Sequence, residues 1–298
     1  MKLALALGAA ALVSGACVPS VFPPAPSMVT PAPFVTPTPT SSPTPKPEPT
    51  PAADQVTTVR VYFLLTLADG TTGLVPVQRE LAMPIDAAAM AMQALLDGPS
   101  TAEAAASPAP FSRIPAGTRL VALNMSGPVA SVELSREFLG GGSDAVLQQM
   151  AQVVYTLTQI PTVTSVAISV DRVAITAPVT GGALRRPLKR TDFSAQLPAI
   201  FVDQPAWGSA RTRSPMLIQG YANVFEAQFT VQIRDGAGTV LAAQVTTATC
   251  GSGCWGTFLV RLPYTVTPAQ WGTLRVYSAS AKDGTPENER IYPIWLKP

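Results

Sequence analysis

The placement of proline constrains this chain more than any other feature of its sequence. The chain has 298 residues and 31 prolines, and 13 of those prolines lie between residues 18 and 55. Proline fixes φ and has no backbone N–H, so such a segment cannot join a sheet ladder. Threonine, serine, lysine and glutamate between the prolines supply little for a core. Residues 17–55 are therefore predicted to be a disordered, polyproline-like tether, and folded domains are expected only after residue 55.

The first sixteen residues have the pattern of an export signal. Lys2 precedes an apolar run over residues 3–13, and small residues follow at positions 14–16. This order of a positive, an apolar and a small-residue region is typical of a secretory signal peptide. The run is shorter than the roughly 20 residues that a transmembrane helix needs. We interpret residues 1–16 as a signal peptide and expect an exported protein.

The residue after this signal is a cysteine, and Ser14-Gly15-Ala16-Cys17 resembles the lipobox of bacterial lipoproteins. The resemblance implies that Cys17 carries lipid and becomes the mature N-terminus, anchored to the outer face of the cytoplasmic membrane. Two acyl chains on one cysteine give stable anchoring. Ser14 stands where the lipobox usually has leucine. Plain secretion with a free Cys17 thiol therefore stays open as the alternative.

Composition excludes several kinds of chemistry. The chain has no histidine, which excludes Ser–His–Asp and Cys–His catalysis and every metal site that needs imidazole. Its three cysteines cannot build a four-thiolate zinc site, and a net charge of +2 does not indicate a nucleic-acid binder. The Gly140-Gly-Gly-Ser143 run lacks the Gly-Lys-Ser/Thr ending of a nucleotide-binding loop. We expect no catalytic residue, metal, nucleotide or other cofactor.

Residues 56–178 combine strand and helix patterns. Apolar, β-branched runs predict strands at residues 59–67, 74–81, 120–125, 129–134, 163–170 and 173–175. Helical spacing predicts one helix capped by Asp86 that ends at Asp97. A second helix is expected to be capped by Ser143 or Asp144 and closed by Pro161. These elements predict an α+β domain whose two helices cover one face of a mixed or antiparallel sheet.

Six blocks of this segment, in order, resemble the GerMN domain of sporulation and spore germination lipoproteins. They are Val61-Tyr-Phe-Leu-Leu, Leu74-Val-Pro-Val, Ala94-Leu-Leu-Asp-Gly-Pro99, Ile114-Pro-Ala-Gly-Thr118, Val132-Glu-Leu-Ser135 with Phe138, and Val153-Val-Tyr-Thr-Leu-Thr-Gln159. The resemblance implies a role in envelope assembly or signalling by protein contact, linked in some members to cell-wall remodelling. It supplies no catalytic residues.

Residues 179–197 form a basic linker between two predicted domains. Four cations lie within six positions, at Arg185, Arg186, Lys189 and Arg190. Such a cluster is a candidate contact for anionic wall polymer or phospholipid headgroups. A solvated linker without a ligand is the simpler interpretation.

Residues 198–298 have the pattern of an all-β immunoglobulin-like sandwich. Seven short strands are predicted, at residues 200–203, 216–224, 228–235, 240–249, 256–262, 274–279 and 290–296. Within the third, Phe229, Val231 and Ile233 alternate with polar residues, as one buried face requires. The order of Gln204-Pro, Gly220-Tyr-Ala-Asn-Val-Phe-Glu226, Asp235-Gly236 and Gly256-Thr-Phe258 resembles the immunoglobulin-like domain of bacterial spore germination proteins.

The remaining two cysteines lie close together, in Cys250-Gly-Ser-Gly-Cys254. Export to an oxidising compartment and two flexible glycines favour a disulfide between them. A redox-active pair is the alternative, although the Cys-x-x-Cys spacing is absent.

Taken together, the patterns favour a non-enzymatic envelope lipoprotein of the spore-formation or germination type. Its N-terminal lipid would bind the membrane, and its two domains would be presented to an envelope protein complex or to peptidoglycan. Four alternatives stay open: a regulatory lipoprotein partner of a membrane sensor, a cell-wall accessory or hydrolase-associated protein, a wall-active enzyme, and a solute-binding lipoprotein.

Overall fold

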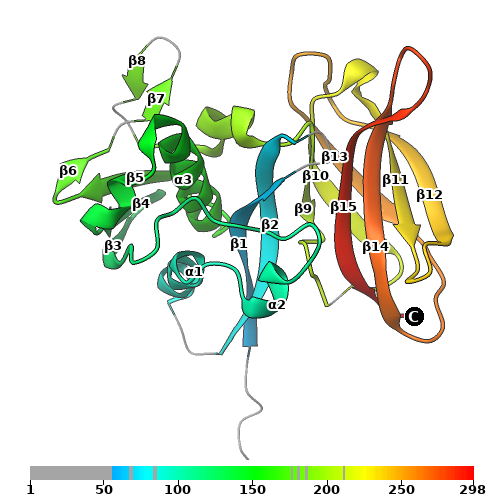
Figure 1. Ribbon diagram of the computed structural model, residues 1–298, viewed down its shortest axis with the longest axis horizontal. Helices are drawn as coiled ribbons and strands as arrows, with labels where there is room; N and C mark the ends of the chain where they lie inside the picture. The colour runs from blue at the N-terminus through cyan, green and yellow to red at the C-terminus, as the bar shows by residue number, and fades with distance from the viewer. Residues whose placement is uncertain are drawn as a thin grey trace, which may run out of the picture. The chain divides into compact units, whose positions relative to one another are not determined.

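In the computed structural model, a central β-hairpin lies between a helical region and a β-sandwich (Figure 1). The structure describes residues 56–66, 70–82, 86–175, 177–179, 182–184, 187–210 and 212–298. The predicted signal, Cys17 and the tether lie outside the described residues, as do Arg185 and Arg186. Residues 51–298 form one compact unit, so contacts between the hairpin and both regions are contacts within one body.

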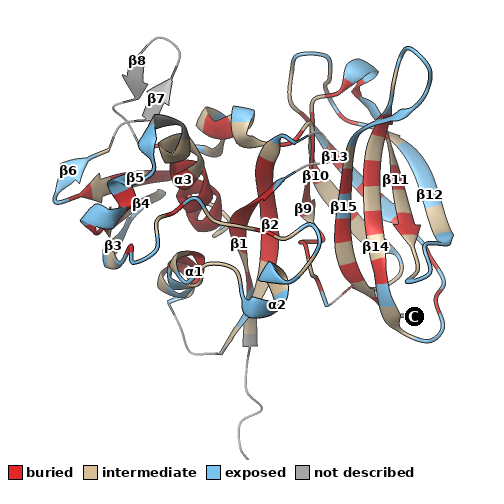
Figure 2. Ribbon diagram, in the orientation of Figure 1, coloured by how far each residue is buried: buried red, intermediate tan, exposed pale blue. Residues whose placement is uncertain are grey.

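The hairpin consists of β1 (Val56–Thr66) and β2 (Thr72–Ala82), paired antiparallel with Leu64 opposite Leu74. Residues 61–65 of β1 and 73–77 of β2 are buried without interruption (Figure 2). A strand with one wet face alternates between apolar and polar residues, whereas a strand covered on both faces is apolar throughout. The hairpin is therefore an internal layer of the molecule.

The remaining elements of the first domain surround one side of this hairpin. They are α1 (Ala87–Leu96), α2 (Thr101–Ala104), β3 (Leu120–Ser126), β4 (Val129–Leu134), η1 (Arg136–Leu139), α3 (Gly142–Leu157), β5 (Ser165–Val170), β6 (Val173–Ala174), β7 (Ala177–Val179) and β8 (Gly182–Leu184). Strands β3-β4-β5-β6 form a mixed sheet in which β4 and β5 are parallel. Parallel neighbours need a crossover, and α3 lies in it.

Side chains of α3 and the residues after it take the place of a third strand beside β1. Gln159 accepts a hydrogen bond from the Arg60 N–H at 2.5 Å and donates one to the Arg60 carbonyl. Thr156 accepts from the Tyr62 N–H at 3.1 Å, and Gln152 donates to the Tyr62 carbonyl at 3.1 Å. These bonds satisfy buried backbone groups that would otherwise form an open sheet edge.

The α+β fold class is as predicted, but two details differ. The six predicted strands do not form one sheet, because α3 packs between β1 and β5 and separates the hairpin from the four-stranded sheet. Helix α3 also begins earlier than predicted, with Gly141 rather than Ser143 or Asp144 at its N-cap. Gly141 and Gly142 have φ of 103° and 79°, and glycine adopts such values readily. Asp86 caps α1 as expected, accepting from the N–H groups of Ala88 and Ala89.

The second domain is the predicted β-sandwich. A 3-10 segment, η2 (Arg190–Gln196), leads into β9 (Ile200–Gln204), β10 (Met216–Ala222), η3 (Phe225–Ala227), β11 (Gln228–Arg234), β12 (Val240–Thr247), β13 (Gly256–Leu262), β14 (Gln270–Ala279) and β15 (Pro286–Leu296). The strands form two antiparallel sheets, ordered β13-β10-β9 and β12-β11-β14-β15. Phe229 and Phe258, one from each sheet, meet edge-on at 4.8 Å between their ring centroids.

Candidate functional site at the domain junction

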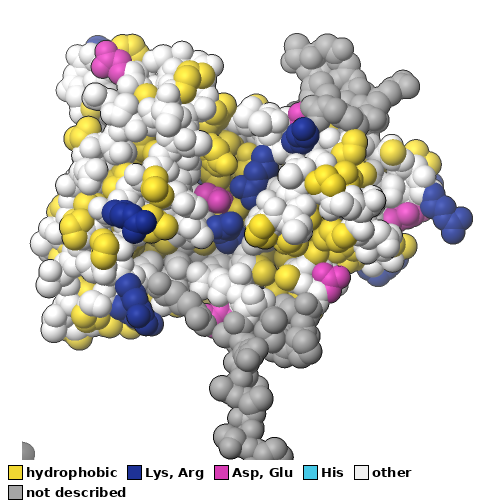
Figure 3. All heavy atoms as spheres, turned by 180° about the vertical axis from the view of Figure 1, so that it is seen from behind, with side chains coloured by type: hydrophobic (Ala, Val, Ile, Leu, Met, Phe, Trp, Pro, Cys, Tyr) yellow, Lys and Arg dark blue, Asp and Glu magenta, His cyan; other side chains and the backbone are white. Residues whose placement is uncertain are grey.

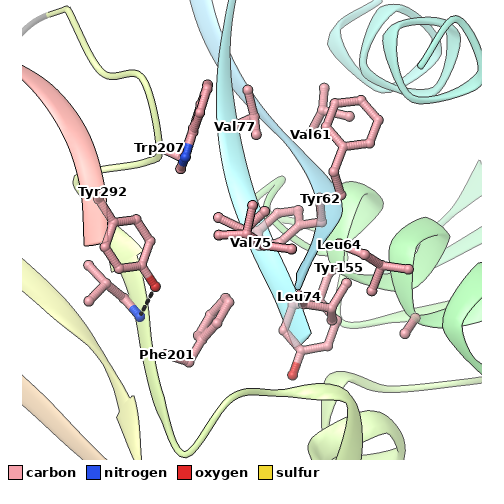
Figure 4. Packing of buried hydrophobic residues seen from close by; sticks show 14 of the residues in the cluster. Val61, Tyr62, Leu64, Leu74, Val75, Val77, Tyr155, Phe201, Trp207 and Tyr292 are labelled. Atoms are coloured by element: carbon pink, nitrogen blue, oxygen red, sulfur yellow. Dashed lines mark hydrogen bonds between the residues drawn. The ribbon is translucent and has the colours of Figure 1, made fainter. Parts of the chain in front are cut away.

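The β1–β2 hairpin of the first domain shares an apolar core with the sandwich. This core includes Val75 and Val77 of β2 together with Phe201, Trp207 and Tyr292 of the second domain (Figure 4). The backbone continues this contact, since the Trp207 N–H donates to the Pro76 carbonyl at 2.8 Å. All these side chains are almost fully buried. The two domains are therefore joined by a packed interior as well as by the chain between them.

A row of four aromatic rings crosses the junction. Tyr155 of α3 lies 5.4 Å from Tyr62 of β1, and Tyr62 lies 6.4 Å from Phe201 of β9, between ring centroids. Phe201 is in turn 6.3 Å from Tyr221 of β10. Such contacts add to the stabilisation from area burial alone. The row connects the helical layer of one domain to the three-stranded sheet of the other.

A charged cluster lies beside these rings. The Tyr62 hydroxyl donates to Asp203 Oδ1 at 2.5 Å. Asp203 Oδ2 lies 3.7 Å from Arg60 Nη1 and 3.9 Å from Arg190 Nη1. The Asp203 side chain is 12% exposed and each arginine side chain is 20% exposed. One carboxylate thus serves two guanidinium groups, which leaves the cluster with an excess positive charge.

Arg190 is integrated into the junction. Its Nε donates to Thr158 Oγ1 at 2.8 Å, and its Nη2 donates to the Tyr155 carbonyl at 3.1 Å and the Tyr62 hydroxyl at 3.2 Å. Its guanidinium also lies over the rings of Tyr155 and Tyr62, 4.7 and 5.2 Å from their centroids. Cation–π contact of this kind strengthens as water is excluded. Arg190 therefore links both domains, a role that the basic-linker interpretation did not include.

Of the other candidate linker cations, the structure describes Lys189. Lys189 is exposed, and its backbone N–H donates to the Asp192 carboxylate at 2.8 Å.

The buried phenols of the junction remain protonated at neutral pH. Burial raises the pKa of Tyr62 well above its ordinary value, and the negative charge of Asp203 raises it further. Burial likewise raises the pKa of Tyr155, although Arg190 opposes the shift. A neutral Tyr62 is a hydrogen-bond donor, as its bond to Asp203 requires.

Two open clefts flank the charged cluster. The first has a volume of about 570 Å³, and its lining includes Thr58, Arg60, Gln78, Gln204, Ser209 and Arg213. The second, of about 490 Å³, is lined by Asp203, Gln219, Tyr221, Thr257 and Leu259, among others. Figure 3 shows cationic and acidic side chains together where the two domains meet. The first cleft offers cations, amides and hydroxyls, which suit a polar ligand with negative charge.

One feature of the sequence indicates this junction, although the predicted strands and helices do not depend on it. Residues 61–65 are apolar without alternation, which indicates a strand covered on both faces. The sandwich covers one of these two faces. The partners Asp203 and Arg60 carry no such signal, because their contact depends on how two domains pack.

The two cysteines of the sandwich form a disulfide, Cys250–Cys254, with Cα atoms 5.8 Å apart. The loop that it closes supports the neighbouring turn. The Ser252 N–H donates to the Val224 carbonyl at 2.9 Å, and Ser252 Oγ accepts from the Glu226 N–H at 3.0 Å. Glu226 has a φ of 53°, a conformation that a non-glycine residue holds only with support. The disulfide loop is part of that support.

Two family models match the chain. Residues 60–175 match the family described as sporulation and spore germination, and residues 199–285 match the immunoglobulin-like domain of bacterial spore germination. The first segment covers the helical domain through β6, and the second covers the sandwich from β9 through β14. Neither description names a reaction. A comparison with curated proteins gave no match.

Solved structures with similarity to the chain include a Clostridium perfringens protein described provisionally as a lipoprotein. It has 24% identity over 48% of this chain and 95% of its own, with a TM-score of 0.30. The first GerMN domain of the Bacillus subtilis sporulation protein GerM has 21% identity over 45% of this chain and 99% of its own, with a TM-score of 0.34. The tandem GerMN domains of GerM have 17% identity over 80% of this chain and 61% of their own, with a TM-score of 0.36.

The fold consists of an α+β domain packed on a β-sandwich, and each domain matches one family model. Residues 60–175 are a GerMN domain of the sporulation and spore germination family, and residues 199–285 are an immunoglobulin-like domain of bacterial spore germination. Among the described residues, no helix is long and apolar enough to cross a membrane.

Proposed function

We propose that this protein is a non-enzymatic lipoprotein of the cell envelope that holds a protein complex or the cell wall with its two domains. Residues 1–16 direct export, and lipid at Cys17 anchors the protein to the membrane. The tether of residues 17–55 sets how far from the membrane the two domains can extend. The GerMN and immunoglobulin-like domains then act as one interaction body on the outer face of the cytoplasmic membrane.

The observation that carries this proposal is the junction itself. Domains joined by a flexible linker move independently, whereas a buried interface fixes their orientation. Here Tyr62, Arg190 and Asp203 connect elements from both domains beside a shared apolar core. A fixed pair of domains offers one continuous surface to a partner, which suits a scaffold.

Anchoring is tested by fractionation and mass spectrometry. We expect the wild-type protein in the membrane fraction with acyl chains on Cys17, and a C17A variant in the soluble fraction. An unmodified Cys17 at the mature N-terminus would contradict the anchor.

Binding to a partner in the envelope is tested by photo-crosslinking in cells from exposed positions on both domains, such as Arg119 and Lys282. We expect captured envelope protein or peptidoglycan. Capture of soluble metabolites alone would count against a scaffold. Turnover of wall material by the purified protein, lost on one side-chain replacement, would establish an enzyme instead.

A further inference from the structure

We propose that the cleft beside Arg60 and Arg213 binds short carboxylate-bearing peptides of the cell wall. This inference rests on the proposed function, because only an exported protein meets such peptides. It assigns the contact with the wall to one place in the fold, at the junction of the two domains.

Charge is the first reason. Arg60 and Arg213 line the cleft, and no carboxylate is among the described residues that line it. Asp203, the acidic partner of Arg60, is shared with Arg190 and lies 3.7 Å away from Arg60. The Nε of Arg60 is buried and has no hydrogen-bond partner within the part of the chain that the structure describes. The positive charge at the cleft is therefore only partly compensated.

The second reason is hydrogen-bonding capacity. The cleft presents the amides of Gln78 and Gln204 and the hydroxyls of Thr58 and Ser209. Ser209 already donates to Gln78 at 2.9 Å, which fixes the amide of Gln78. Amides and hydroxyls both donate and accept, so they can pair with the N–H and C=O groups of a peptide backbone. Guanidinium groups bind carboxylates in preference to neutral groups.

Size is the third reason. A volume of about 570 Å³ lies within the range of small-ligand sites and fits a few residues of extended chain. It is too small for a folded partner. A short peptide with a free carboxylate matches the charge, polarity and volume together.

The test uses the mature chain and stem peptides released from purified peptidoglycan by an amidase. Binding is measured by calorimetry, with the same peptides amidated at their carboxylates as the comparison. We expect binding of the free acids that weakens as salt increases, and a loss of about tenfold or more on amidation. The R213Q variant should weaken binding to a similar degree. K282Q, which removes an exposed cation from the same domain, should leave binding unchanged.

Arg60 is tested by R60Q, with R119Q as its matched control in the GerMN domain. Because Arg60 also pairs with Asp203, R60Q can unfold the junction, whereas Arg213 is exposed and R213Q avoids this problem. Equal affinity for free and amidated peptides, or wild-type affinity of R213Q, would overturn the inference.

Intact walls separate this inference from the broader proposal. Pelleting with peptidoglycan is expected to fall when an amidase has removed the stem peptides. If pelleting and peptide binding are both absent while crosslinking still captures an envelope protein, the scaffold proposal stands and the cleft assignment fails.

Discussion

Tyr62 and Asp203 are 141 positions apart in the chain, and a hydrogen bond of 2.5 Å joins their side chains. Tyr62 belongs to the hairpin of the GerMN domain and Asp203 to the first strand of the sandwich. The bond is buried, and Arg60 and Arg190 hold the same carboxylate. The relative orientation of the two domains is thus set by specific side-chain chemistry, which makes it accessible to point substitutions.

Replacement of Tyr62 by phenylalanine should destabilise the protein by about 2 kcal/mol. The variant keeps the ring and its aromatic contacts but removes the donor to a buried carboxylate, and such bonds contribute roughly 1.5–3 kcal/mol. Urea unfolding of the mature chain measures the change. The matched control is Y277F. Tyr277 is half-buried on β14, where its hydroxyl accepts a 3.2 Å hydrogen bond from Gln232. Loss of this bond should lower the unfolding free energy by clearly less than the loss of the Tyr62 bond. Equal losses of unfolding free energy for the two substitutions would show that the Tyr62–Asp203 bond contributes no more stability than the half-buried bond of Tyr277.

Stability should fall at high pH because of the buried phenols. The pKa of Tyr62 and of Tyr155 is raised above the ordinary 10.0, chiefly by burial. Below about pH 10 the folded and unfolded chains hold these protons equally, so the contribution of both phenols is fully present. Above it the unfolded chain releases them while the folded chain keeps them, and the free energy of unfolding decreases.

Ultraviolet titration and urea unfolding check this expectation. Tyr62 and Tyr155 should resist ionisation until the chain unfolds. The Y62F/Y155F double variant should lose less stability between about pH 9 and pH 11 than the wild type. Ionisation of Tyr62 and Tyr155 near pH 10 without unfolding would contradict it.

Much of the fold follows from local pattern. The strand expected at residues 256–262 is β13 without a shift, and β11 shows the predicted alternation with Phe229, Val231 and Ile233 buried. Asp86 caps its helix as its residue type predicts. Turn chemistry and a period of two residues are local properties, so sequence carries them.

The junction does not follow from local pattern, for physical reasons. Gln152 and Thr156 are polar and look like solvent-facing positions of α3, yet both are fully buried because they bond the backbone of β1 about 90 residues earlier. Arg190 lies in a dense group of cations, which usually indicates a solvated segment. Its actual partners come from α3, β1 and β9, and only tertiary packing brings these together.

The buried amide of Gln152 gives a third prediction. Its Nε2 donates to the Tyr62 carbonyl at 3.1 Å, and its Oε1 accepts from the Arg113 N–H at 3.0 Å. Leucine of similar volume in its place leaves both backbone groups unpaired, and each such group costs about 1–3 kcal/mol. We expect Q152L to lower the unfolding free energy by about 3 kcal/mol.

Its control is Q148L on the same helix, where the side chain loses one exposed 3.2 Å bond from Arg113 Nε. That substitution should change stability by less than about 0.5 kcal/mol. A similar loss for both variants would mean that α3 does not serve as a substitute strand.

The disulfide gives a fourth prediction. A disulfide that closes a loop as short as residues 250–254 restricts the unfolded chain only slightly. Its reduction should therefore lower the free energy of unfolding by about 2 kcal/mol or less. The effect should be local, since the loop supports the turn around Glu226 through Ser252. Hydrogen exchange of the C250S/C254S variant should show faster exchange at residues 224–227, with the junction unchanged. Global loss of protection would contradict a local role.

Gly220 should be intolerant of any side chain. A Cβ at this position would lie 1.9 Å from the Phe201 carbonyl oxygen, far inside van der Waals contact, and the blocking atom is backbone. The pairing of β10 with β9 also shifts register between Gln219 and Gly220. The backbone that approaches Gly220 so closely is therefore that of β9, the strand that carries Phe201 and Asp203. We expect G220A to displace β9, to lower the unfolding free energy by more than about 3 kcal/mol, and to weaken the Tyr62–Asp203 bond.

The control is G238A. Gly238 has open space around its Cβ position and a φ of 87°, so this substitution incurs only backbone strain of about 1 kcal/mol. Near-equal stability of the two variants, measured by urea unfolding, would refute the close packing of β9 on β10.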